Sequence, residues 1–106
     1  MGYLREFKLN SGTTVVIDNK KIMILREDLK NIKGNLGRAK GKVIIRLSAV
    51  SGIIKYGDYL LICGNGLPLP KEFKSSNIVD VKQYPNCIVG TIEEVKELFY
   101  YINDLL

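Results

Sequence analysis

The stretch TTVVIDNKKIMILR, residues 13–26, decides the fold of this chain. Residues 13–17 are β-branched at every position, and such side chains favour the extended backbone of a strand. The polar residues Asp18-Asn19-Lys20-Lys21 favour a turn, and a second apolar run, residues 22–26, follows them. Two strand-like runs joined by a short polar turn predict a β-hairpin.

The segments on both sides of the hairpin continue this pattern of short strands. Residues 3–9 alternate between a mainly apolar and a mainly polar side, which predicts a strand with one face in water. Residues 27–41 contain three glycines and predict a long loop. Further strands are predicted over residues 42–47, over 48–56 with a bulge or bend at Gly52, over 58–63, over 78–81 and over 87–89.

The turns between the later strands have their own signals. Gly64-Asn65-Gly66 permits positive φ and predicts a sharp reversal. The following Leu67-Pro68-Leu69-Pro70 predicts an extended connector, because proline cannot serve a central strand. Tyr84-Pro85-Asn86 predicts another turn.

The C-terminal residues change to a helical period. Thr91 is a suitable N-cap, and Glu94 stands three residues later, as a capping box requires. The predicted helix therefore runs from Thr91 to about Leu106. Seven apolar residues form one stripe that is expected to lie on the sheet: Ile92, Val95, Leu98, Phe99, Ile102, Leu105 and Leu106. The opposite side carries Glu93, Glu97, Tyr100 and Asp104 and is expected to face solvent.

Six or seven short strands followed by one helix predict a mainly β fold with a single C-terminal α-helix. Strands joined by tight turns pair in the antiparallel sense. The length fits one domain, residues 1–106, with a β-sheet over residues 3–90 and a capping helix over residues 91–106.

This order of elements resembles the pleckstrin-homology-like superfold, and more narrowly the short bacterial domains of this kind that occur beside SHOCT segments. The likeness is carried by the hairpin at 13–26, the glycine-rich basic stretch 34–41, the segments 43–53 and 57–62, and residues 86–89 followed directly by the helix. The resemblance implies a strongly curved antiparallel sheet, or partly open barrel, capped by the helix. The basic spacing of lipid-binding members is only loosely matched by Lys20, Lys21 and Arg26, so phosphoinositide binding is not implied.

The sequence argues against several classes of function. The longest apolar runs fall short of the roughly 20 residues that cross a bilayer, and no signal peptide is recognisable, so a cytoplasmic location is expected. Without histidine, the chain lacks the commonest general base and metal ligand. Cys63 and Cys87 lie in apolar stretches and predict buried thiols. We therefore expect no enzymatic activity, no metal and no small-molecule cofactor.

The net charge of +5 is unevenly distributed. Residues 20–46 contain nine basic and two acidic side chains, a local charge of +7, so the rest of the chain carries −2. The candidate binding residues lie in and beside the predicted loop: Lys30, Lys33, Arg38, Lys40 and Lys42. Such a loop either keeps the protein in solution or meets an anionic partner.

Three functions are compatible with this pattern. The first is a noncatalytic binding or assembly module that recognises a protein partner or another copy of itself, the acidic helix side of one copy meeting the basic loop of the next. The second is electrostatic binding of nucleic acid or an anionic membrane surface through the 30–42 loop, although residues 20–46 contain no aromatic residue for base stacking. The third is a small inhibitor from a mobile genetic element that blocks another protein's surface.

Overall fold

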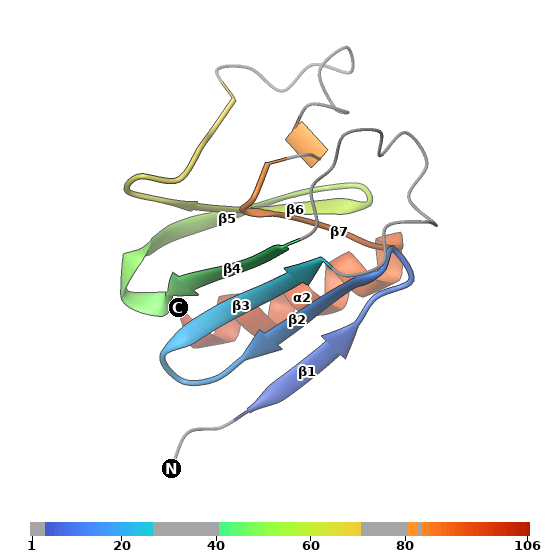
Figure 1. Ribbon diagram of the computed structural model, residues 1–106, viewed down its shortest axis with the longest axis horizontal. Coiled ribbons are helices and arrows are strands. Elements are labelled where there is room, and N and C mark those ends of the chain that lie inside the picture. Colours follow the sequence, from blue (N-terminus) through green and yellow to red (C-terminus); the bar gives the residue numbers. More distant parts are fainter. Residues whose placement is uncertain (1–3, 27–40, 71–80, 83) are drawn as a thin grey trace.

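The computed structural model describes residues 4–26, 41–70, 81–82 and 84–106, and this part of the chain contains seven strands and one long helix (Figure 1). The strands form two antiparallel sheets. The first sheet has the order β1-β2-β3-β4, with strands at Arg5–Lys8, Thr13–Ile17, Lys21–Arg26 and Gly41–Arg46. The second has the order β5-β6-β7, with strands at Val50–Tyr56, Tyr59–Gly64 and Cys87–Val89.

The predicted hairpin is confirmed as β2 and β3, paired with Thr13 opposite Arg26 and Ile17 opposite Ile22. Its turn is held by the Asp18 carboxylate, which accepts hydrogen bonds from the backbone N–H groups of Lys20 at 2.7 Å and Lys21 at 2.8 Å. These bonds stabilise the ionised carboxylate and hold the pKa of Asp18 below its ordinary value. Aspartate favours this turn because its side chain can accept hydrogen bonds from backbone N–H groups two and three residues ahead.

The strands divide into two sheets at a short 3-10 helix, Leu47–Ala49. The sequence predicted extended backbone from Ser48 onward, and the 3-10 turn corrects this. Gly64, at the end of β6, lies against this corner, where a Cβ atom would collide with the backbone carbonyl of Ala49. The predicted irregularity at Gly52 is confirmed, because the register of β5 on β6 shifts between Val50 and Gly52. The two sheets do not close into a barrel.

The helix α2, Ile92–Leu105, begins as predicted. The Thr91 hydroxyl accepts a hydrogen bond from the backbone N–H of Glu94 at 3.1 Å, and the Glu94 carboxylate accepts one from the N–H of Thr91 at 2.8 Å. In Figure 1, α2 lies behind the first sheet. Its residues share one core cluster with both sheets, which includes Ile24 of β3 and Ile62 of β6. The buried side of the helix therefore contributes to a core that both sheets share.

The predicted stripe of seven apolar helix residues is only partly correct. Val95, Leu98 and Ile102 are fully buried, and Phe99 packs against the same core. Ile92, Leu105 and Leu106 are exposed by 58 %, 39 % and 54 %. They share the helical period of the stripe but occupy the two ends of the helix, where fewer neighbours cover them. The sequence period predicts which side is buried and cannot show where the covering surface ends.

Two buried polar side chains hold the segment before β7 in place, Arg26 from the first sheet and Asn86 from the segment itself. The Arg26 guanidinium donates hydrogen bonds to the carbonyl oxygens of Tyr84 and Cys87. Burial lowers its pKa, although arginine keeps its charge. The Asn86 side-chain amide donates to the carbonyl oxygens of Ile62 at 2.7 Å and Pro68 at 2.9 Å. Arg26 belongs to the basic stretch of the sequence, but in the structure it is buried and connects the two sheets by these hydrogen bonds.

The remaining local predictions have mixed outcomes. The strand at 87–89, the turn at Tyr84-Pro85-Asn86 and the positive φ of Gly66, at 84°, are confirmed. Residues 67–70 form no strand, as predicted. The predicted strand at 78–81 is wrong at Val81, which is helical together with Lys82, and its other residues lie outside the described ranges. The predicted loop over 27–41 also lies outside them, except for Gly41, which begins β4.

No helix in the described ranges is both long and apolar enough to cross a lipid bilayer.

Candidate functional site

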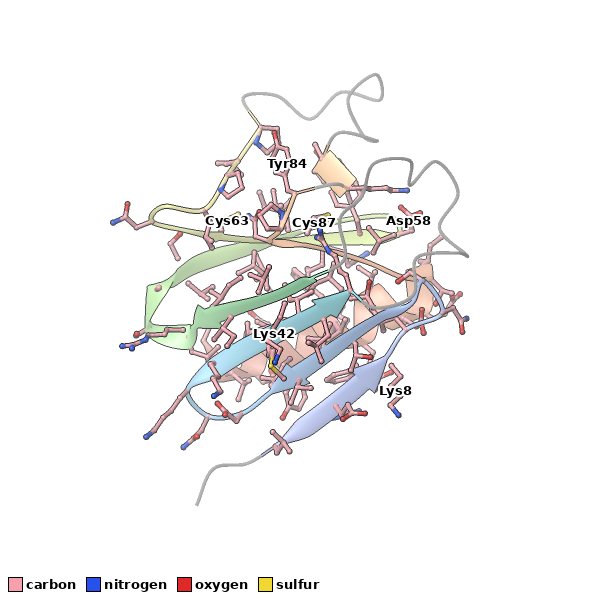
Figure 2. All side chains as sticks on the ribbon, viewed as in Figure 1. Lys8, Lys42, Asp58, Cys63, Tyr84 and Cys87 are labelled. Atoms are coloured by element: carbon pink, nitrogen blue, oxygen red, sulfur yellow. The ribbon has the colours of Figure 1, made fainter. Side chains whose placement is uncertain are left out.

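Only one of the five predicted binding residues lies in the described part of the chain. Lys42 is exposed on β4 and pairs with Leu25 of β3 (Figure 2). Lys30, Lys33, Arg38 and Lys40 lie outside the described residues. The candidate site is therefore built from the basic residues that the strands of the first sheet position around Lys42.

The face of the first sheet that points away from the core carries a row of apolar residues. Inner and outer side chains alternate along β2, β3 and β4, and the inner ones include Val15, Ile22 and Ile45. On the outer side, Val16 pairs with Met23, and Met23 pairs with Ile44. Val16 and Met23 are partly exposed, and Ile44 is exposed by 55 %.

Basic residues flank this apolar row on both sides. Lys21 and Arg46 pair with each other on one side, and Lys42 lies on the other side, paired with Leu25. All three cations are exposed. We call the surface formed by these residues the outer face: Val16, Lys21, Met23, Leu25, Lys42, Ile44 and Arg46. It combines apolar contact area with positive charge, which suits an anionic partner that also has apolar groups.

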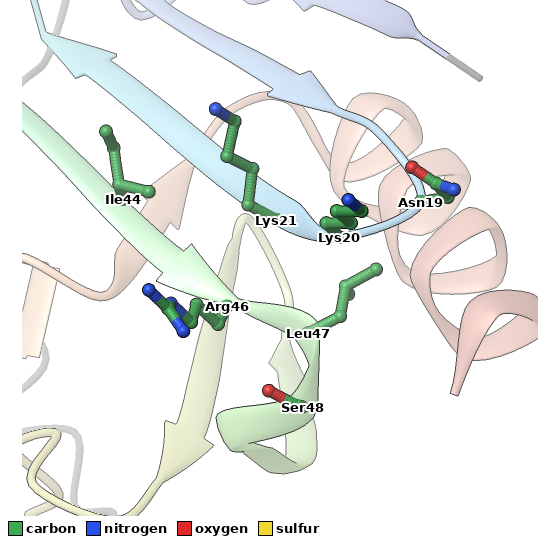
Figure 3. Close-up of a pocket in the computed structure, with 7 residues that line it drawn as sticks. All are labelled: Asn19, Lys20, Lys21, Ile44, Arg46, Leu47 and Ser48. Atoms are coloured by element: carbon green, nitrogen blue, oxygen red, sulfur yellow. The ribbon is translucent and has the colours of Figure 1, made fainter. Parts of the chain in front are cut away.

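A pocket of about 630 Å³ lies at one end of the outer face, where the β2–β3 turn meets the corner after β4 (Figure 3). We call it the basic pocket. Its lining residues are Asn19, Lys20, Lys21, Ile44, Arg46, Leu47 and Ser48. Three of these are cations, Asn19 and Ser48 add hydrogen-bonding groups, and none of the described lining residues is acidic.

The cations of the basic pocket form no ion pair in the described residues. The ion pairs there lie elsewhere: Arg5 with Glu97 at 2.6 Å, Lys8 with Glu6 at 3.6 Å, and Lys82 with Asp58 at 2.9 Å. Asp18 is the acid adjacent in sequence to the pocket, and its carboxylate is bound by the backbone N–H groups of the turn. Asp18 also interacts electrostatically with Lys21 and Lys20, so part of the positive charge is offset and the remaining excess is available to an external anion.

Lys21 and Arg46 form a like-charge pair across neighbouring strands. In the adjacent pair, the backbone N–H of Leu47 donates a hydrogen bond of 2.8 Å to the carbonyl oxygen of Lys20. Hydrogen-bonded and non-hydrogen-bonded pairs alternate in an antiparallel ladder, so Lys21 and Arg46 occupy a position where side chains come closer together. Like charges directly opposite each other destabilise a sheet. The fold thus keeps an unfavourable pair at the pocket.

Replacing Arg46 with glutamate is expected to stabilise the protein. Arg46→Glu converts the repulsive pair into an attractive one, which should raise the free energy of unfolding by about 0.2–1 kcal/mol. Denaturant unfolding at low salt would measure the gain, and high salt should reduce it. Lys42→Glu makes the same charge change opposite Leu25 and should give a smaller gain or none. Equal gains from both variants would contradict local repulsion at the pair.

The acidic side of α2 offers less free charge than the sequence suggested. Glu97 is bound by Arg5, whose guanidinium also lies 4.5 Å from the ring centre of Phe7 and 5.0 Å from that of Tyr101. Glu93 and Asp104 are exposed, as predicted. The contact between Arg5 and Glu97 therefore fastens β1 to the helix and leaves a smaller acidic surface.

Neither of the two cysteines forms a disulfide, as predicted. Cys87 is buried, and Cys63 is partly buried. Burial raises the pKa of the Cys63 thiol, which disfavours the nucleophilic thiolate. In the described ranges, acids and thiols do not gather in a group that could hold a metal ion.

Sequence reasoning missed the residues that form the basic pocket. It counted Lys20, Lys21 and Arg46 in the basic stretch but placed the site in the loop. Lys21 stands two residues before Met23, and Arg46 stands two residues after Ile44. Side chains two residues apart lie on the same face of a strand, so this spacing indicates that the cations and the apolar residues share one face. Leu47 and Ser48 carry no such signal, because they reach the pocket only through the 3-10 turn.

Comparisons of the chain with protein-family models, with curated proteins and with solved structures found no match.

Proposed function

We propose that this chain is a noncatalytic binding module of the pleckstrin-homology-like type, and that it recognises an acidic segment of a protein partner through its outer face. The order of seven strands and one C-terminal helix supports the resemblance. The observation that carries the functional proposal is the position of Lys21, Arg46 and Lys42 beside the exposed Ile44.

A partner segment with both acidic and apolar side chains matches this surface best. An extended segment laid across the strands would place apolar side chains on Met23 and Ile44 and carboxylates beside the flanking cations. Complementary charge speeds the encounter and selects the partner, while apolar contact adds binding energy. Nucleic acid fits less well, because the described residues of the outer face and the basic pocket include no aromatic side chain for stacking.

A second copy of the chain is a weaker candidate for the partner. The helix α2 lies behind the first sheet (Figure 1), on the side opposite the outer face, so contact between copies would be head-to-tail and would form rings or open chains. The contact of Glu97 with Arg5 and the net charge of +5 both oppose this assembly. An inhibitor from a mobile genetic element could use the same acidic-segment recognition, so the proposal also includes that role.

A peptide-binding measurement tests the proposed function. The probe is a fluorescent peptide of repeated Glu-Glu-Leu triplets, and a Lys-Lys-Leu peptide of equal length is the control ligand. Fluorescence anisotropy should show binding of the acidic peptide alone. The double variant Lys21→Glu/Arg46→Glu should weaken it by about tenfold or more, equivalent to ~1.4 kcal/mol.

A matched variant controls for net charge. Lys55 and Lys96 are exposed on β5 and α2, away from the outer face. Lys55→Glu/Lys96→Glu changes the net charge by the same amount and should leave the affinity within about twofold, because distant surface charges are screened by salt. Equal losses in the two double variants, or no binding of the acidic peptide, would refute the proposal.

A further inference from the structure

We propose that the basic pocket binds a phosphoryl group carried on a serine or threonine of the protein partner. This inference rests on the proposed function and names the chemistry of the partner at one position. It starts from the basic pocket of about 630 Å³, whose lining includes Lys20 of the turn, Lys21 of β3 and Arg46 of β4.

The charge of the pocket exceeds what a single carboxylate would neutralise. Three cations line it, and they form no ion pair with any residue that the structure describes. A phosphoryl group carries a charge of about −1.5 to −2 at neutral pH and three strong acceptor oxygens. It can therefore accept charge-assisted hydrogen bonds from Lys20, Lys21 and Arg46 together, with the planar Arg46 guanidinium able to bind two oxygens.

The like-charge pair is the second observation that favours a dianion. Lys21 and Arg46 lie directly opposite each other at a position where side chains approach closely, which has an unfavourable energy in the free protein. Figure 3 shows the two side chains extending in different directions, so both would turn toward a bound dianion, which would replace repulsion by attractive contacts. Such a pair lowers the stability of the free protein and favours the binding of an anion.

Asp18 leaves the basic pocket open and positions two of its cations. Its carboxylate binds the backbone N–H groups of Lys20 and Lys21, so these bonds fix the turn from which both side chains project. The same bonds hold the carboxylate within the turn. Asp18 also interacts electrostatically with Lys21 and Lys20 and offsets part of their charge, so the three cations and this one acid leave a net positive charge at the pocket.

The surroundings of the pocket favour a phosphorylated protein over a membrane. The chain has no tryptophan, and the pocket's described lining includes no aromatic side chain that could anchor in a lipid interface. Ile44 lines the pocket and also continues the apolar row of the outer face. A short phosphoserine or phosphothreonine side chain would let the neighbouring residues of the same segment contact Ile44 and Met23. The longer phosphotyrosine would hold that segment farther from the sheet.

The first test is an NMR titration of the isotope-labelled full chain with O-phospho-L-serine. Saturable shifts are expected at the backbone amides of Lys20, Lys21 and residues 46–48. L-serine should cause none, and sulfate should cause weaker shifts. The variant Lys21→Gln/Arg46→Gln should lose the response, whereas Lys55→Gln/Lys96→Gln should keep it. Absence of localised shifts, or their persistence in Lys21→Gln/Arg46→Gln, would overturn the proposal.

The second test separates this inference from the proposed function. A Glu-Glu-Leu peptide with one central phosphoserine should bind about tenfold more tightly than the unmodified peptide, because the phosphoryl group adds charge-assisted hydrogen bonds to the cations of the pocket. If both peptides bind equally and both need Lys21 and Arg46, the proposed function stands and the phosphoryl site does not. If neither peptide binds, both proposals fail.

Two further arms distinguish other sources of phosphate. A phosphotyrosine peptide of the same sequence should bind more weakly than the phosphoserine peptide, and tighter binding would refute the assignment to a short side chain. Vesicles of phosphatidylcholine containing a phosphatidylinositol phosphate should not cosediment the protein. Cosedimentation that needs Lys21 and Arg46 would overturn the choice of a protein partner.

Discussion

Leu98→Ala is expected to lower the free energy of unfolding by about 2–5 kcal/mol. Leu98 is fully buried and belongs to the core cluster that includes Ile24 of β3 and Ile62 of β6. Truncation removes apolar contacts within this core and leaves a cavity that the surrounding residues can fill only in part. Denaturant unfolding followed by circular dichroism would measure the change.

The exposed end of the same helix supplies the control for this result. Ile92→Ala also shortens a branched apolar side chain of α2, but Ile92 is 58 % exposed. Its free energy of unfolding should change by less than about 0.5 kcal/mol, as is usual for surface substitutions. If the two variants were equally stable, Leu98 could not be buried in the core as the structure describes.

The second large effect is expected at Asn86. Asn86→Ala removes the amide that donates to the carbonyl oxygens of Ile62 and Pro68, and it leaves both without this donor. A buried polar group without a partner costs about 1–3 kcal/mol, so we expect destabilisation in that range. The loss of the buried Asn86 Oδ1, which has no hydrogen-bond partner among the described residues, offsets part of the cost.

Thermal and denaturant unfolding would measure the effect of Asn86→Ala. Asn103→Ala removes the same side chain from an exposed position on α2 and should change the stability by less than about 0.5 kcal/mol. Amide hydrogen exchange should also become faster in β6 and β7 of the Asn86 variant. The Ile62 N–H donates to the backbone carbonyl of residue 86, and this bond should open more often when the side chain no longer holds the segment in place. Unchanged exchange and stability would show that Asn86 does not join these segments.

The proposed functions depend on local features of the first sheet, so they can be separated from these stability effects. Leu98 and Asn86 lie away from the outer face, and their replacement should reduce binding only through the fraction of folded protein. Lys21 and Arg46 are exposed, and their replacement should change affinity while the fold persists. A variant that loses affinity and gains stability, as expected for Arg46→Glu, is the clearest sign of a site maintained for binding.

The parts of the fold that were predicted correctly depend on local chemistry. β-branched residues at 13–17 and the Asp18 turn define the hairpin, and the capping box at Thr91 and Glu94 marks the start of α2. Each of these signals acts over a few neighbouring residues and needs no information about the rest of the molecule. For the same reason the unbridged cysteines and the solvent side of the helix followed from composition and period.

The incorrect or missing predictions depend on contacts between distant segments. The end residues of the apolar stripe are exposed because the core does not extend to them, and Arg26 is buried because its strand ends beside the Tyr84–Cys87 turn. The basic pocket forms because the β2–β3 turn lies next to the corner after β4. The two-residue spacing of cations and apolar residues on β3 and β4 indicates that they share a face. A count of charges over residues 20–46 does not show this spacing.

The sequence by itself determined the strands, the hairpin, the capped helix and the concentration of positive charge between residues 20 and 46, because propensity, periodicity and charge are properties of neighbouring residues. Only the tertiary structure decided that the strands divide into two sheets at Leu47–Ala49, that α2 shares one core with both sheets, and that Lys20, Lys21 and Arg46 line one pocket. Pairing register and the packing of distant segments determine these arrangements, and both arise only when the whole chain folds.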